Sequence, residues 1–341
     1  MSNAPSLALV DRPQLNLLDK AAVWASLLLA GFLFLTVGWF AMEPDDPMGA
    51  VSLLTRDSSI VMFLQATALI VVTASLATAM AGRKLADAGI FAAAVGLAAV
   101  SLRGGTVAYL LMRDGDGIGS TQRSLAILFA LEAVGWFAAL VIAIGASGLL
   151  VRWCFLNSDP SDQREDDVAA QALGTTSASD IPGIGVLLFG GAFEYQTGLS
   201  RGIRHALITT VVGLAAFYVL STGTATRAMQ HGQACFVVAA SVYAGCYVAH
   251  RLSPARSALW SILAVGLMAV AGYLWSALRP DVSGAPITAP SSPFLRVLPI
   301  QFVSVGTAVA VAMFWQMYVP PADTQPASGR SERESLARNA S

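Results

Sequence analysis

Glu132 is the side chain whose chemistry is least expected from its surroundings. It lies in the run ILFALEAVGWFAALVIAIGASGLL (residues 127–150), which is otherwise apolar. A charge near the centre of a bilayer costs at least about 2.5–3.5 kcal/mol, so it normally faces protein or water and has a partner. The preceding apolar run, AGIFAAAVGLAAVSLRGGTVAYLLM, contains a basic residue, Arg103, that could be this partner.

Arg103 and Glu132 are expected at the same depth, because the segment 113–123 joins the two runs as a loop. At about 1.5 Å per helical residue, Arg103 lies about 13 Å below Met112 and Glu132 about 12 Å below Ser124. Each charge also shares a helical face with small residues, which lets another backbone approach closely. These small residues are Gly135, Ala139, Ala143 and Ser147 after Glu132, and Ala92, Gly96 and Ala99 before Arg103. Antiparallel docking of the two faces predicts an ion pair between Arg103 and Glu132.

Two interpretations of this intramembrane ion pair are open. A structural pair would fix which helix packs on which, whereas a functional pair would relay protons or anchor a substrate. Gln65, in an earlier apolar run, and Gln301, in the last one, are expected on the same side of the bilayer. They could form a polar layer together with the ion pair, or they could make independent interhelical hydrogen bonds.

The composition assigns these residues to a membrane protein. Of 341 residues, 55% are hydrophobic and only 12% are charged, about half the charged share of an ordinary soluble domain. The net charge of −1 comes from scattered acids and bases, which argues against a nucleic-acid partner. The three cysteines lie in or beside apolar runs and do not form a secreted disulfide framework. We therefore expect the lipid bilayer to be the main surroundings of the chain.

The chain contains eight apolar runs near the roughly 20 residues that one membrane crossing needs, which predicts an all-α polytopic integral membrane protein with about eight transmembrane helices. The runs cover about 21–42, 59–81, 88–112, 124–151, 203–222, 233–250, 257–277 and 297–319. Segments on the side of the termini carry Arg12, Lys20, Arg83, Lys84, Arg152, Arg164, Arg201, Arg204, Arg251, Arg256, Arg330, Arg333 and Arg338, and the opposite loops carry Arg56, Arg113, Arg123, Arg227, Arg279 and Arg296. This bias predicts a plasma (inner) membrane protein with both termini in the cytoplasm.

A polar segment divides the runs into two sets of four. The predicted parts are a cytoplasmic N-terminal segment (1–20), a first four-helix half (21–151), a cytoplasmic linker (152–202), a second four-helix half (203–319) and a disordered C-terminal tail (320–341). The apolar part of the linker, 183–198, is too short to cross and fits either an interfacial segment or a loop packed on helix ends. In each set a short basic turn joins the second and third runs, which makes a duplication of parallel repeats one interpretation of the pattern.

Motifs for catalysis or metal binding are sparse. GASG at 145–148 resembles the GxSG of rhomboid-type intramembrane proteases, but no histidine precedes His205, so Ser147 is better explained by the small-residue face. His205 and His250, both expected at cytoplasmic helix ends, could ligate one metal or haem, although histidines at such ends are commonly interfacial. We therefore predict no metal site and no cofactor.

Three classes of function remain. The first is a non-catalytic integral membrane protein, a subunit, assembly partner or scaffold of a membrane complex, with protein partners or as a homo-oligomer. The second is a small-molecule or ion permease that uses a polar layer around Arg103 and Glu132, with the two halves rocking across the linker. The third is an intramembrane enzyme, which the shortage of intramembrane chemistry disfavours. The sequence favours the first class.

Overall fold

The computed structural model describes residues 17–46, 49–55, 58–81, 87–118, 121–156, 199–222, 229–255, 257–278 and 292–317. All regular elements in these ranges are helical, which confirms the all-α class for the described part of the chain. In chain order they are α1 (Leu17–Leu33), η1 (Phe34–Gly38), α2 (Trp39–Met42), α3 (Ser59–Ala81), α4 (Asp87–Arg103), α5 (Val107–Ile118), α6 (Gln122–Leu156), α9 (Leu199–Thr222), α10 (His231–Leu252), α11 (Ala258–Leu278), η3 (Pro293–Arg296) and α12 (Pro299–Met317). The predicted N-terminal segment, most of the linker with its 183–198 piece, and the C-terminal tail lie outside the described residues.

Seven helical segments in the described ranges are long and apolar enough to cross a membrane, as a multi-pass membrane protein requires. They are Lys20–Met42, Ser59–Ala81, Gln122–Leu150, Ser200–Thr222, His231–Leu252, Ala258–Leu278 and Pro299–Met317. The first of these runs from α1 through the π-helical turn η1 into α2. The membrane class predicted from the composition therefore agrees with the helices, with seven candidate spans in place of eight.

The predicted run 88–112 is not one continuous helix. It divides at Gly104 and Gly105 into α4, which has 17 residues, and the short helix α5. A loop from the α2–α3 connection lies against this break, and the Gly105 N–H donates a 2.7 Å hydrogen bond to the Gly49 carbonyl. A Cβ on Gly104 would lie 2.8 Å from the Val51 side chain and 2.9 Å from the Gly49 carbonyl oxygen. The helix ends here because the loop occupies the space that a further turn would need.

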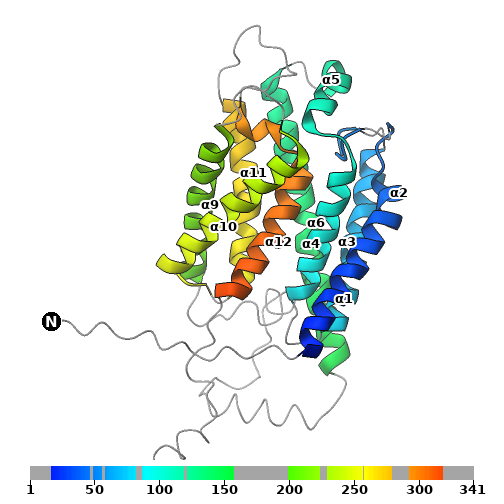
Figure 1. Cartoon of the computed structure of the whole chain (residues 1–341), viewed down its shortest axis with the longest axis vertical. Helices are drawn as coiled ribbons and strands as arrows, with labels where there is room; N and C mark the ends of the chain where they lie inside the picture. Colours follow the sequence, from blue (N-terminus) through cyan, green and yellow to red (C-terminus); the bar gives the residue numbers. More distant parts are fainter. Residues whose placement is uncertain are drawn as a thin grey trace, which may run out of the picture.

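The long helices run side by side, roughly along one axis (Figure 1). We call the end where α2 ends and where α6 and α12 begin the upper end, and the end where α1 begins and where α3 and α10 end the lower end, as they lie in Figure 1. On one side α1, α3 and α4 pack on one another and α6 packs on α3; on the other side α9 packs on α10 and α11. The two sides meet where α6 packs on α11 and where α12 packs on α4 and α6.

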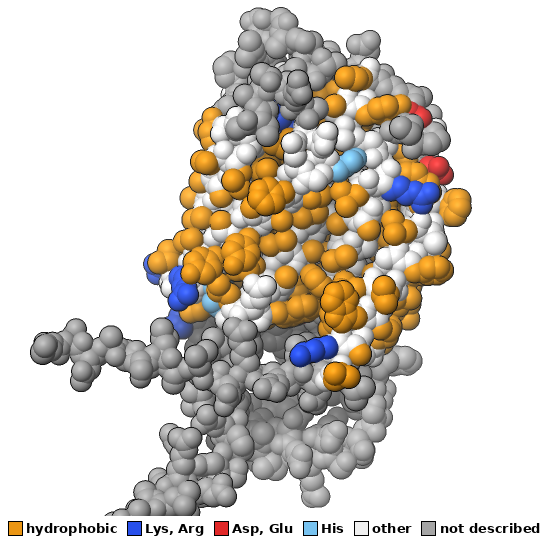
Figure 2. Space-filling model, in the orientation of Figure 1, with side chains coloured by type: hydrophobic (Ala, Val, Ile, Leu, Met, Phe, Trp, Pro, Cys, Tyr) orange, Lys and Arg blue, Asp and Glu red, His pale blue; other side chains and the backbone are white. Residues whose placement is uncertain are grey.

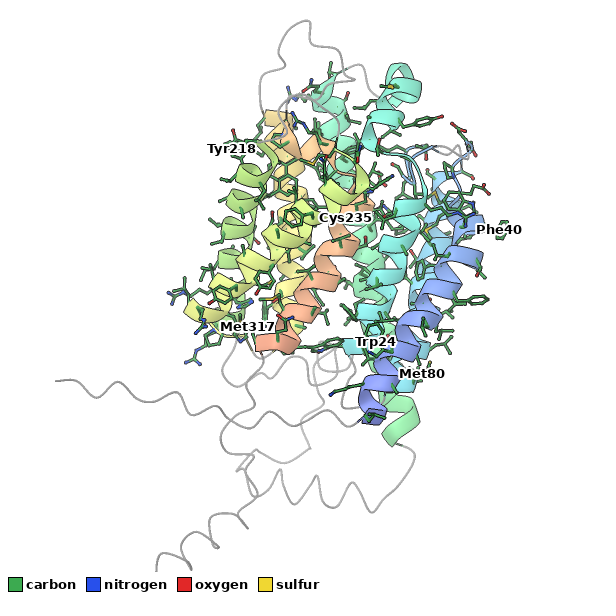
Figure 3. All side chains as sticks on the ribbon, viewed as in Figure 1. Trp24, Phe40, Met80, Tyr218, Cys235 and Met317 are labelled. Carbon is green, nitrogen blue, oxygen red and sulfur yellow. The ribbon has the colours of Figure 1, made fainter. Side chains whose placement is uncertain are left out.

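Apolar side chains on the flanks face away from the bundle. Trp24, Leu28 and Phe32 recur every four residues on α1 and are all exposed, so they form one stripe along the helix. Phe40 of α2 also points away from the bundle (Figure 3). Hydrophobic atoms cover much of the visible flank, with charged side chains near its ends (Figure 2). This distribution is the one expected for helices in contact with lipid.

Close helix packing depends on glycine where α9 crosses α10. A Cβ on Gly245 would lie 2.5 Å from the Thr209 carbonyl oxygen and 3.2 Å from the Gly213 nitrogen. Both are backbone atoms, so no side chain could move aside to make room. The crossing holds α9 and α10 together along most of their length.

Candidate functional site

The Glu132 carboxylate accepts three hydrogen bonds from donors on two segments. The Ser52 hydroxyl donates to Oε2 at 2.6 Å, the Leu53 N–H donates to Oε1 at 3.1 Å, and the Trp136 indole N–H donates to Oε1 at 2.9 Å. Glu132 is only 3% exposed. Bonds of this kind to an ionised acceptor are about twice as strong as neutral ones, so three of them can hold a buried carboxylate without a basic partner.

The two loop donors belong to residues 49–55, which we call the clamp loop. Ala50, Val51 and Ser52 are fully buried, so the loop enters the upper end of the bundle. Within the loop, the Leu54 N–H donates to the Ser52 hydroxyl at 3.2 Å and the Thr55 hydroxyl donates to the Ala50 carbonyl at 3.1 Å. Glu132 thus accepts hydrogen bonds from the Ser52 hydroxyl and the Leu53 N–H, which the bundle buries away from water.

Arg103 lies in the last turn of α4 and has partners of its own. Its Nη1 donates a 2.8 Å hydrogen bond to the Leu35 carbonyl, and its guanidinium carbon lies 4.1 Å from the centre of the Trp39 ring. Leu35 belongs to the π-helical turn η1, and such widened turns leave backbone groups open to side-chain partners. The Arg103 side chain is exposed.

The structure corrects the predicted ion pair, because it gives Arg103 and Glu132 separate partners. The depth count assumed that helix continues from Arg103 to Met112, whereas α4 ends at Arg103. The small-residue faces do not dock on each other either. Gly96 of α4 faces Phe34 of η1, and α6 packs mainly on α3 and α11.

The predicted polar layer is divided in the same way. Gln65 is exposed on α3, away from the buried polar groups. Gln301 is 2% exposed and lies among residues of α4 and α10. Its amide nitrogen lies 2.7 Å from Nδ1 of His231 and 3.5 Å from the Ser101 carbonyl, and Nε2 of His231 lies 2.8 Å from the Gly104 carbonyl. These contacts assign the neutral Nε2–H tautomer to His231, with Nδ1 as acceptor.

His205 and His250 lie close together at the lower end, with ring centres 6.0 Å apart. Both ring nitrogens of His205 already have partners: Nδ1 lies 2.9 Å from the Ser253 carbonyl, and Nε2 lies 3.0 Å from the Ser261 hydroxyl. His205 therefore ties α9 to the α10–α11 turn and to α11. In the described part of the chain, no group of three or more histidines, cysteines and acids is placed to hold a metal ion.

A further group of polar side chains is buried without partners. Four hydroxyl oxygens in the described ranges have no hydrogen-bond partner, namely those of Thr73, Ser147, Ser304 and Thr307. They come from α3, α6 and α12. Buried hydroxyl groups normally have a hydrogen-bond partner. A hydroxyl group without a protein partner can therefore accept water or a polar ligand as its partner.

Several site residues were not among the sequence predictions. Trp136 could have been found, because it follows Glu132 by four residues and so lies on the same helical face. Ser52 and Leu53 come from a loop 79 or more residues away, and no local pattern reports such a contact. His231 begins α10 after a polar stretch, which marks a helix start but not its partners.

The polar side chains of the described upper end act mainly on backbone. They hold the clamp loop and the α4–α5 break in fixed positions, and the Tyr109 hydroxyl adds a 2.6 Å hydrogen bond to Asp46 between α5 and the α2–α3 connection. No family model matches the chain, and neither a curated protein nor a solved structure was found to be similar to it.

Proposed function

We propose that this protein is a non-catalytic integral membrane protein that acts as a subunit, assembly partner or scaffold of a membrane complex. The observation that carries the proposal is the hydrogen bonding of Glu132. The most conspicuous acid of the apolar helices is engaged by Ser52, Leu53 and Trp136, and its task is to order a loop. A proton relay or a substrate anchor would need that carboxylate to be free for its ligand.

The described part of the upper end is the face that a partner would meet in this proposal. The clamp loop is held by Glu132, and the segment that contains η3 is held by a 2.8 Å hydrogen bond from the Tyr273 hydroxyl to the Val297 carbonyl. Such a preordered surface loses little conformational entropy when it binds another protein. This fits a subunit that presents one fixed face to its complex.

The proposal includes eight crossings in two four-helix halves. α4, with 17 residues, spans about 25 Å and would be the eighth crossing. In a duplication, the helices of the first half would correspond in order to those of the second: α1 to α9, α3 to α10, α4 to α11 and α6 to α12. The packing of α6 on α11 would then have its counterpart in the packing of α12 on α4. This exchange is the one that two parallel repeats would make, whereas the close packing of α3 on α4 has no counterpart between α10 and α11. The bias of basic residues supports cytoplasmic termini, and hence a cytoplasmic lower end, in an inner membrane.

Native mass spectrometry of the protein extracted from its own membrane in a mild detergent tests the subunit proposal. We expect a mass above 35.5 kDa by the mass of one or more other proteins. Glu132→Gln should reduce the partner-bound fraction, because it weakens the clamp loop. The control is Gly232→Ala at the start of α10, where a Cβ would meet nothing within 4 Å. A protein that is always alone, under conditions that preserve other membrane complexes, would contradict the proposal.

A permease is the second candidate, and the unpaired buried hydroxyls favour it. Thr73, Ser147, Ser304 and Thr307 could bind a polar solute or water between helices of the two halves. Uptake of labelled solutes into proteoliposomes tests this candidate. Ser304→Ala with Thr307→Ala should abolish uptake if these hydroxyls line the path, whereas wild-type vesicles no more permeable than protein-free ones would exclude it.

A further inference from the structure

Three arginines gather at the lower end of the α9–α10 pair. Arg201 and Arg204 lie in the first turns of α9, and Arg251 lies in the last turn of α10, all with exposed side chains. The two helix ends are adjacent, because the Ser253 hydroxyl donates a 3.1 Å hydrogen bond to the Arg201 carbonyl. Figure 2 shows basic side chains clustered at this corner of the molecule. We call Arg201, Arg204 and Arg251 the arginine corner.

The backbone under the arginine corner is firmly held. Gly245 lets α9 and α10 touch backbone to backbone, and His205 joins α9 to the Ser253 carbonyl just beyond α10. Arg251 is also positioned by Tyr247, since its guanidinium carbon lies 5.4 Å from the ring centre and its Nη2 donates to the hydroxyl at 3.4 Å. The three guanidinium groups therefore extend from a fixed base.

No acid on these helices neutralises the arginine corner. Neither α9 nor α10 contains Asp or Glu. Among the side chains described at the lower end, the acid is Asp87 of α4, on the other side of the bundle. Among the described residues, the corner thus presents three positive charges, and guanidinium groups suit phosphate because they can donate two parallel hydrogen bonds to it.

Exposed apolar side chains continue from the arginine corner along the same two helices. On α9, Leu207 is 54% exposed and Val211 is 65% exposed; on α10, Tyr243 is 47% exposed. The rings of Tyr243 and Tyr247 are stacked with their centres 6.4 Å apart. Inward from the helix ends, arginine is followed by tyrosine on α10 and by aliphatic surface on α9, which fits the headgroup and acyl-chain regions of a phospholipid.

From this complementarity we infer that the arginine corner binds the phosphate headgroup of an anionic phospholipid in the leaflet at the lower end. The acyl chains of this lipid lie along the exposed faces of α9 and α10. An acidic soluble protein would pair with the arginines but would leave the apolar faces unused. The inference does not depend on the proposed function, since a subunit or a permease could equally hold such a lipid.

Lipid titration followed by native mass spectrometry tests the inference on the purified full-length chain. The probes are phosphatidylglycerol and phosphatidylcholine with identical acyl chains, added to the delipidated protein in detergent. We expect wild type to bind phosphatidylglycerol more tightly than phosphatidylcholine. Each of Arg201→Gln, Arg204→Gln and Arg251→Gln should weaken phosphatidylglycerol binding by roughly fivefold, as expected for one basic residue near an anionic surface, and leave phosphatidylcholine binding unchanged. The matched control is Arg123→Gln, which removes an exposed arginine of α6 at the upper end and should change neither affinity.

Three outcomes would overturn the inference. One is equal affinity of wild type for the two lipids, and another is an equal loss in Arg123→Gln and in the corner variants. The third concerns free phosphate: if inorganic phosphate binds the wild-type corner as tightly as phosphatidylglycerol does, the ligand is the ion and not the lipid. Each single variant leaves two arginines and the buried contacts of α9 and α10 in place, so a loss of lipid binding is not a loss of folding.

Discussion

Ser52 and Glu132 are joined by a 2.6 Å hydrogen bond across 80 positions of the chain. This contact closes the clamp loop onto α6, and it explains how a carboxylate is accommodated in an apolar helix without a basic neighbour. Three donors from the loop and from Trp136 satisfy the two carboxyl oxygens.

Glu132→Ala should destabilise the protein more than any other single change at the clamp loop. It leaves the Ser52 hydroxyl, the Leu53 N–H and the Trp136 indole N–H without their acceptor, at about 1–3 kcal/mol for each buried donor that stays unpaired. Ser52→Ala removes one of the three donors to Glu132 together with the acceptor of the Leu54 N–H, and it should cost about 1–3 kcal/mol. Thermal unfolding in detergent, followed by tryptophan fluorescence, measures both. Equal midpoints for Glu132→Ala and wild type would show that Glu132 does not hold the loop.

Arg103→Ala should have a small effect that is independent of Glu132. The exposed guanidinium loses its contact with the Trp39 ring, a kind of interaction that contributes about 0.5–1 kcal/mol at exposed sites. Because the two charges have separate partners, the double variant with Glu132→Ala should equal the sum of the single effects within about 0.5 kcal/mol. The same unfolding assay gives all three values. If the double variant is much more stable than the sum of the single effects predicts, the result would support the direct ion pair expected from the sequence.

Gly245→Ala should separate α9 from α10. The new methyl group would lie 2.5 Å from the Thr209 carbonyl oxygen, so the helices must move apart, at a cost of about 1–3 kcal/mol. Gly232→Ala, on the same helix but with open space around its Cβ, should be neutral or slightly stabilising. Cysteine cross-linking between α9 and α10 and the unfolding midpoint both report the difference. Similar behaviour of the two variants would mean that the close crossing is not required.

The apolar runs predict most of the helices because hydrophobicity over about 20 residues is a local property of the chain. The same reasoning fails at 88–112, where the composition stays apolar but a distant loop packs against Gly104 and ends the helix. The prediction of an ion pair between Arg103 and Glu132 fails for a related reason. Helical spacing indicates which residues share a face of one helix, but tertiary packing decides which other segment that face contacts. Gln301 stands out in the sequence as a polar residue in an apolar run, but its partners His231 and Ser101 come from two other helices, which no local pattern indicates.

Gln301→Leu should loosen the upper contact between α4, α10 and α12. The amide of Gln301 bridges His231 of α10 and the Ser101 carbonyl of α4, so its removal leaves the Nδ1 acceptor of His231 unpaired in a largely buried position. His231→Ala breaks the same bridge from the other side and also removes the hydrogen bond to the Gly104 carbonyl. Because the two residues contact each other, their effects on the free energy of unfolding should couple by about 0.5–3 kcal/mol in a double-mutant cycle.

Hydrogen exchange should show faster exchange of the amides near Gly105 in both variants, since the α4–α5 break loses its support, while amides of α3 keep their protection. Strict additivity of the two changes, with unaltered exchange at residues 104–107, would show that the His231–Gln301 bridge does not join these helices.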